Sequence, residues 1–268
     1  MKSQESGSFE TLLIEQPREF VRVITLNRPQ VANAFNTLMA TELMTWFEAL
    51  ALNHDGVRCV IVTGAGERAF CAGGDLKERN GMTNDAWEKQ HRIFERMTRA
   101  VIDCPVPVIA AVNGAAFGGG CELACAMDFI YASDSARFAM PETSLGIIPG
   151  AGGTQTLSRA VGERRAKELL LSGKAFNASQ AHDWGLANAV FPPDILMESS
   201  LEIAEKIAGN APIAVRQAKQ AIHRGLQMSL SDGLGFEIEA YNRTVPTEDR
   251  QEGVRAYNEK RPPEFKGK

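Results

Sequence analysis

The sequence has no long apolar segment free of charge and turn-forming residues. Its longest stretch without a charged residue lies between Asp103 and Glu122, and that stretch contains Pro105, Pro107 and four glycines. A helix that crosses a bilayer needs about 20 consecutive apolar residues, so we expect no membrane span. The first ten residues, MKSQESGSFE, are polar and lack the apolar core of a secretory signal. We therefore expect a cytoplasmic protein.

Cysteine and histidine are scarce, with five and four residues respectively. The cysteines are Cys59, Cys71, Cys104, Cys121 and Cys125, and they form neither a CxxC pair nor a Cys/His spacing typical of metal ligands. Disulfide frameworks and structural zinc sites depend on such patterns. We expect reduced thiols and no metal site.

A basic excess is also missing, because 29 Lys and Arg stand against 33 Asp and Glu, a formal net charge of −4. Proteins that bind nucleic acid usually carry a basic surface, so a nucleic-acid partner is not expected. The chain has 268 residues, of which 44% are hydrophobic, and this is enough to bury a sizeable core.

Periodicity predicts an α/β body followed by a helical region. Apolar residues recur at strand or helix spacing along the first two thirds, and the last third is mostly helical. The expected strands cover residues 20–26, 58–63, 107–112 and 129–132, and the expected helices of this body cover 37–52, 84–102 and 118–127. The Pro192-Pro193 pair is the best candidate for a change of subdomain, between residues 1–192 and residues 193–268.

Glycine is concentrated in two turns. Residues 69–76 read AFCAGGDL and residues 113–123 read NGAAFGGGCEL. Glycines at the start of a helix expose backbone N–H groups and let a ligand approach the main chain. Two such turns could direct two N–H groups at one oxygen, as an oxyanion hole requires. The alternative is that these glycines only permit tight turns and close packing.

Two glutamates lie among apolar neighbours. Glu122 lies in GCELACAM, and Glu142 lies between FAMP and TSLGII. A buried carboxylate is costly unless it is paired, so Glu122 is either a functional acid or a structural carboxylate that pairs with an arginine or caps a backbone group. Apolar surroundings raise the pKa of a carboxyl group, which makes Glu142 a candidate general acid.

These parts together favour one kind of chemistry. Two N–H donors stabilise an enolate oxygen, and two carboxyl groups transfer protons beside it. Addition of water to a double bond conjugated to a thioester needs this set. Phosphoryl transfer would require a P-loop or metal ligands, and the sequence contains neither.

Almost the whole chain resembles the crotonase (enoyl-CoA hydratase/isomerase) family. The similar segments, in family order and spacing, are LNRP at 26–29, NAF at 33–35, FCAGGDLKE at 70–78, NGAAFGGGCELA at 113–124, PETSLGIIPGAGGTQTLSRAVG at 141–162 and EKRPPEFKG at 259–267. The resemblance implies a spiral of repeated ββα units over residues 1–192 and a helical trimerisation region over residues 193–268. It also implies an acyl-CoA substrate, no cofactor beyond the CoA of that substrate, and a homo-oligomer that is a trimer or a dimer of trimers.

The resemblance assigns catalytic roles residue by residue. It implies that the N–H groups of Gly74 and Gly119 form the oxyanion hole for the thioester oxygen. Glu122 matches the family acid that holds and activates water together with its partner, and Glu142 matches the acid that delivers a proton to the α-carbon.

The resemblance also assigns residues to the CoA part of the substrate. Ala72 matches a main-chain contact to the adenine, Lys77 matches a cation near the phosphates, and Asp75 and Leu76 lie between them in the same segment. Tyr257 and Lys260 match C-terminal positions that complete the CoA site, often from a neighbouring subunit.

Because both glutamates are present, we expect a hydratase that adds water syn across a 2-trans-enoyl-CoA and gives a 3-hydroxyacyl-CoA. Two alternatives stay open. One is another crotonase reaction, either double-bond isomerisation or hydration of a branched or dicarboxylic acyl-CoA, since the ending TVPTEDRQEG…KRPPEFKGK is similar to methylglutaconyl-CoA hydratases. The other is a module that binds acyl-CoA without catalysis.

Overall fold

The computed structural model describes residues 9–54 and 56–268. Its larger sheet is six-stranded, and all neighbouring strands are parallel except the first pair. In spatial order the strands are β1 (Leu12–Arg18), β2 (Val21–Leu26), β3 (Cys59–Gly64), β5 (Val108–Val112), β7 (Phe129–Ser133) and β10 (Ala189–Phe191).

A second sheet of four short strands lies beside it. The strands are β4 (Ala69–Cys71), β6 (Ala115–Phe117), β8 (Arg137–Ala139) and β9 (Phe176–Asn177), and the first three are parallel. The chain alternates between the sheets, because β3, β5 and β7 each lead directly into β4, β6 and β8. Helices α3 (Asn84–Ile102), α4 (Gly119–Cys125) and α5 (Gly153–Val161) follow these strand pairs. The expected spiral of ββα units is thus confirmed.

The strongly periodic helices match the sequence predictions. Helix α1 covers Thr37–Leu52, and α3 covers Asn84–Ile102. The residue that caps α1 is Asn36, whose side chain accepts a hydrogen bond from Met39 N. Strands of three residues, such as β4 and β6, are too short to carry a periodic pattern, and they were not predicted.

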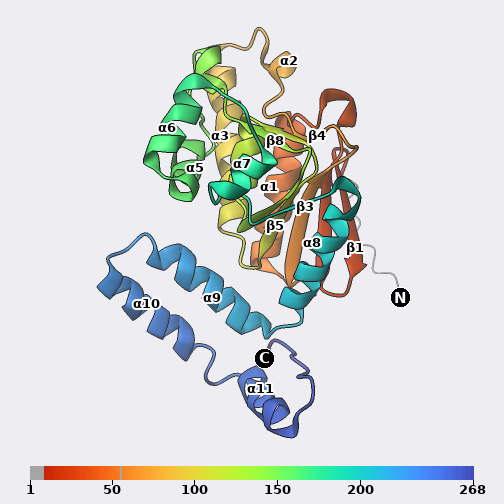
Figure 1. The fold of residues 1–268 in the computed structure, drawn as a ribbon, viewed down its shortest axis with the longest axis vertical. Coiled ribbons are helices and arrows are strands. Elements are labelled where there is room, and N and C mark those ends of the chain that lie inside the picture. Colours follow the sequence, from red (N-terminus) through yellow and green to blue (C-terminus); the bar gives the residue numbers. More distant parts are fainter. Residues whose placement is uncertain (1–8, 55) are drawn as a thin grey trace.

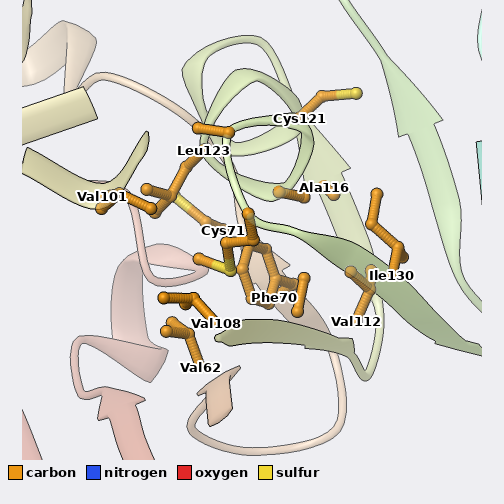
Figure 2. Close-up of a cluster of buried hydrophobic side chains, with 14 of the residues drawn as sticks. Val62, Phe70, Cys71, Val101, Val108, Val112, Ala116, Cys121, Leu123 and Ile130 are labelled. Carbon is orange, nitrogen blue, oxygen red and sulfur yellow. The ribbon is translucent and has the colours of Figure 1, made fainter. Parts of the chain in front are cut away.

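Two hydrophobic clusters cover the two faces of the larger sheet. Helices α1 and α3 contribute Phe47, Met97 and other buried side chains to one cluster. Helix α8 (Pro193–Ala208) packs Leu196 and Ala204 against the other face. Figure 2 shows part of the first cluster, in which side chains of β4 and α4 lie close together. This packing fixes β4, which leads into Gly73 and Gly74, and α4, which follows Gly118.

The C-terminal helices extend away from the sheets. Helices α9 (Pro212–Gly225) and α10 (Leu230–Asn242) pack against each other as a hairpin, and α11 (Glu248–Glu259) lies beyond it (Figure 1). The remaining elements are α2 (Leu76–Arg79), α6 (Glu163–Ser172), α7 (Ala178–Asp183) and the 3-10 helices η1 (Pro29–Val31) and η2 (Glu142–Leu145). Within the described residues, no helix is long and apolar enough to cross a membrane. The subdomain division at residue 192 stays a prediction.

Candidate active site

A cavity of about 650 Å³ brings the two glycine turns and the two glutamates together. Its lining includes Gly73, Gly74, Gly118 and Gly119 from the turns, Glu122 from α4 and Glu142 from η2. Trp87, His91 and Phe94 on α3 complete the wall, with Leu145, Ile147 and Ile148 after Glu142. Segments distant in sequence therefore supply one concave, partly apolar site of the kind that holds small molecules.

The glycine turns are in direct contact. A Cβ at Gly73, where φ is +91°, would lie 2.7 Å from Phe117 O and 3.0 Å from Gly119 N. Hydrogen bonds from Phe35 N to Gly73 O (2.9 Å) and from Asp75 N to Phe35 O (2.9 Å) hold the first turn. Across residues 9–54 and 56–268, neither Gly74 N–H nor Gly119 N–H donates to a protein acceptor. Both N–H groups remain available to a ligand oxygen.

Phe35 fills the space behind the turns. Its side chain is 2% exposed, and its ring meets the Phe94 ring edge-on at 4.8 Å. A Cβ at Gly119 would lie 2.5 Å from Phe35 Cζ, so close packing and ligand access both explain the glycine here. This supporting role could not be predicted from the sequence, because nothing in the local pattern distinguishes Phe35 from an ordinary core residue.

Asp75 anchors the first turn and is not part of the cavity wall. Its carboxylate accepts hydrogen bonds from Arg28 Nη1 (2.9 Å), Lys77 N (3.0 Å) and Glu78 N (3.4 Å). Burial opposes ionisation, but Arg28 and the two N–H groups outweigh it and lower the pKa of Asp75. The ion pair links the turn to the segment that contains η1.

Glu122 is buried and held by backbone donors. The residue is 3% exposed, and its Oε1 accepts hydrogen bonds from Ala151 N and Gly153 N, both at 2.8 Å. Burial raises the pKa of Glu122, while the N–H groups of Gly153 and Ala151 and the nearby His91 act in the opposite direction. These donors favour the ionised form and orient it.

Glu142 lacks such support. It is 7% exposed, and its Oε2 has no hydrogen-bond partner among the described residues. Burial raises the pKa of Glu142 to about 7, and the charge of Glu122 acts in the same direction. Below about pH 7 the protonated form of this carboxyl group predominates, so it can donate a proton into the cavity.

The structure brings some of the residues assigned to CoA binding to the cavity and leaves others outside. Ala72 and Leu76 line it, whereas Lys77 does not. Tyr257 is 85% exposed on α11, and Lys260 follows that helix. Helix α11 lies at the opposite end of the molecule from α2 (Figure 1). Within one chain these last two residues are remote from the cavity.

The cavity also contains charged residues that the sequence analysis did not single out as site residues. Arg79, Glu88, Arg92 and Glu95 all line it, together with His91. Each belongs to a polar helix segment, where solvent exposure was the simplest expectation. Across the described residues, no group of three or more His, Cys, Asp or Glu side chains could hold a metal ion.

Gly153 provides a test of the contacts that hold Glu122. A Cβ at this position would lie 2.7 Å from Met140 Sδ, 2.8 Å from Glu122 Cγ and 2.9 Å from Glu122 Oε1. We expect Gly153→Ala to lower the free energy of unfolding by about 1–3 kcal/mol, because the core must shift to admit the methyl group. Denaturant unfolding measures this change.

Gly209 is the matched control for that substitution. It lies at the end of α8 in a helical conformation, and its Cβ would make only ordinary contacts of 3.4 Å or more. Gly209→Ala should leave the free energy of unfolding unchanged or raise it by up to about 1 kcal/mol. Equal destabilisation by the two substitutions would contradict the specific packing of Gly153 against Glu122.

Comparison with known proteins identifies the family. A family model described as Enoyl-CoA hydratase/isomerase matches residues 17–268. YngF from Bacillus subtilis is 46% identical over 259 residues, which cover 96% of this chain and 99% of YngF. The short-chain-enoyl-CoA hydratase of Clostridium acetobutylicum is 44% identical over 241 residues, 90% of this chain and 92% of that protein.

A solved structure agrees over the full fold. The crystal structure of an enoyl-CoA hydratase from Bacillus anthracis is 45% identical and superposes with a TM-score of 0.95, covering 97% of this chain and 100% of that one. The resemblance seen in the sequence is thereby confirmed, and so is the fold. The chain belongs to the enoyl-CoA hydratase/isomerase (crotonase) family of enzymes.

Proposed function

We propose that this enzyme adds water syn across the double bond of a 2-trans-enoyl-CoA and produces a 3-hydroxyacyl-CoA. The observation that carries the proposal is one cavity that contains two unengaged backbone N–H groups and two glutamates in different environments. The hydratase name of the Clostridium relative supports the same reaction. We propose no cofactor beyond the CoA that is part of the substrate.

The glycine turns stabilise the charge that develops during the reaction. The thioester oxygen accepts hydrogen bonds from Gly74 N–H and Gly119 N–H, which have no competing acceptor in the described part of the chain. When water attacks C3, electrons move to this oxygen and form an enolate. Donors that are already oriented stabilise the enolate more than the neutral thioester, and this difference lowers the barrier.

The glutamates divide the proton transfers. Glu122, ionised and oriented by Ala151 N–H and Gly153 N–H, accepts a proton from the attacking water as the water oxygen bonds to C3. Glu142, protonated up to a pH of about 7, donates its proton to C2 as the enolate collapses. The net change is the addition of one water molecule, and the two carboxyl groups exchange protonation states.

The CoA part of the substrate extends from the thioester along the first glycine turn. We propose that the main chain at Ala72 contacts the adenine and that Lys77 faces the phosphates, in keeping with the family resemblance. We also propose that Tyr257 and Lys260 complete this site from a neighbouring copy, since α11 is remote from the cavity of its own chain. The cytoplasmic location stays a prediction from the sequence.

Replacing each glutamate tests the mechanism. Glu122→Gln and Glu142→Gln should each lower kcat for hydration of 2-butenoyl-CoA by about 10²–10⁴-fold, because each removes an acid or base of the transition state. Loss of enoyl-CoA absorbance measures the rate. Glu163→Gln is the control, since Glu163 is exposed and forms an ion pair with Lys167 outside the cavity, and it should keep the rate of the unmodified enzyme. Full activity of both cavity variants would refute the assigned roles.

We further propose that the protein assembles as a homo-oligomer, either a trimer or a dimer of trimers. The α9–α10 hairpin extends from the body and exposes large apolar side chains: Ile222, Leu226, Leu230, Leu234, Ile238 and Tyr241. A clustered apolar surface of this kind is typical of an interface. A second copy of the chain is the occupant that would also bring α11 to a neighbouring cavity.

Charge introduced on the hairpin tests the assembly. The double substitution Leu234→Glu and Ile238→Glu should convert the oligomer to a smaller species, because unpaired carboxylates are costly in an apolar interface. Light scattering coupled to size-exclusion chromatography measures the mass. Leu52→Glu, at a side chain 90% exposed on α1, should leave the mass unchanged. A monomeric unmodified protein would contradict the proposal.

A further inference from the structure

Arg79 places a guanidinium group inside the proposed active site. It is the last residue of α2, four residues after Asp75, and it lines the cavity. Its Cζ lies 3.7 Å from the position that a Cβ on Gly74 would occupy. The cation therefore lies directly beside one of the two proposed oxyanion donors.

Stacking and a buried amide hold this guanidinium in place. Its Cζ lies 4.1 Å from the centre of the Trp87 ring and 5.0 Å from that of Phe94. Its Nε donates to Gln90 Oε1 at 2.8 Å, and Gln90 is only 4% exposed. The Gln90 amide nitrogen donates in turn to Thr37 Oγ1 (2.8 Å) and to Glu78 Oε2 (2.7 Å). A fixed position of this kind suits recognition of a ligand.

The two terminal nitrogens of Arg79 are unused by the protein. Over the described part of the chain, neither donates a hydrogen bond, and no carboxylate lies within the 4.0 Å of an ion pair. Burial lowers the pKa of Arg79, and the charge of Glu78 opposes this effect. Because arginine stays protonated in proteins, the group remains a cation without a counter-ion.

Other charges around the cavity do not neutralise it. Glu95 Oε1 lies 3.5 Å from His91 Nε2, so the polar neighbour of the Glu95 carboxylate is His91 and not Arg79. Glu88 and Arg92 also line the cavity, and they carry opposite charges. Neither acid forms an ion pair with Arg79, so the stacked guanidinium is the fixed cation nearest to Gly74.

We propose that Arg79 binds a carboxylate on the acyl chain of the substrate, so that the preferred substrates are 2-enoyl-CoA thioesters of dicarboxylic acids. This inference rests on the proposed function, which places the thioester carbonyl at Gly74 and Gly119. The first carbons of the acyl chain then lie beside Arg79, whereas the pantetheine arm separates the CoA phosphates from it. An alkyl chain would remove water from the guanidinium and offer no hydrogen-bond acceptor in its place. A carboxylate, in contrast, can accept two parallel hydrogen bonds from it.

Binding of two saturated ligands tests the inference without requiring turnover. Pentanedioyl-CoA and pentanoyl-CoA have equal acyl length and differ in a terminal carboxylate, and neither has a double bond to hydrate. Isothermal titration calorimetry on the unmodified protein should give a Kd about 10–100-fold lower for pentanedioyl-CoA, the range expected for a charge-assisted pair.

Three variants assign the preference to Arg79. Arg79→Met should reduce the ratio of the two Kd values to about one, since it removes the cation and keeps a long side chain. Arg79→Lys should restore part of the ratio, because a lysine keeps the charge without the planar pair of donors. Arg96→Met is the control: Arg96 lies on α3, pairs with Glu48 and does not line the cavity, so the ratio should not change. Should Arg79→Met fail to fold, Arg79→Gln takes its place.

The outcomes separate this inference from the proposed function. Equal affinities in the unmodified protein, or an equal loss for both ligands in Arg79→Met, would overturn carboxylate recognition, the latter because Arg79 would then contact the CoA part. Hydration of both 2-pentenedioyl-CoA and 2-pentenoyl-CoA is measured in parallel. Failure of hydration with a preserved affinity ratio would overturn the hydratase proposal and leave the carboxylate site in place.

Discussion

Two carboxyl groups buried in one cavity cannot both carry a charge without a large cost, and the active site depends on how the backbone resolves this conflict. The N–H groups of Ala151, just before α5, and of Gly153, at its start, bind Oε1 of Glu122 and partly offset the burial that raises its pKa. Burial raises the pKa of Glu142 to about 7, and among the described residues no donor reaches its Oε2 to offset this effect. We propose that this difference gives two residues of one chemical type the roles of base and acid.

The same conflict explains why glycine is required around the site. Gly153 N–H reaches Glu122 only because no Cβ intervenes, and the two glycine turns touch only because Gly73 has no Cβ to meet Gly119 N. The buried pairing of β4 and β6 and the packing of Phe35 hold these turns in register. Much of the hydrophobic core therefore acts as the support for a few backbone N–H groups.

The sequence allowed the long elements and the two glutamates to be predicted, for physical reasons that particular residues show. Helix α3 presents a regular apolar stripe, so both of its ends were predicted correctly. Glu122 and Glu142 are conspicuous because an acid among apolar residues is costly. The strand β4 has only three residues and no periodic pattern, so it required the structure.

The position of Arg79 in the cavity could not be predicted from the sequence, for a different reason. In LKER it resembles the end of a solvated helix, and only the folded chain stacks it on Trp87 and places it beside Gly74. The contact depends on residues separated in sequence and on the buried amide of Gln90. The residues next to Arg79 in sequence do not indicate that Trp87 and Gly74 are its neighbours in space, whereas the apolar residues next to Glu122 and Glu142 do indicate that these acids are buried.

The proposed division of acid and base requires that Glu142 is protonated near neutral pH while Glu122 is ionised. Infrared difference spectroscopy between about pH 5 and about pH 9 observes the C=O stretch of a protonated carboxyl group directly, since ordinary glutamates are ionised over most of this range. We expect a band that disappears with a midpoint near pH 7, is absent in Glu142→Gln and persists in Glu122→Gln. A spectrum without such a band, or a band unchanged in Glu142→Gln, would contradict it.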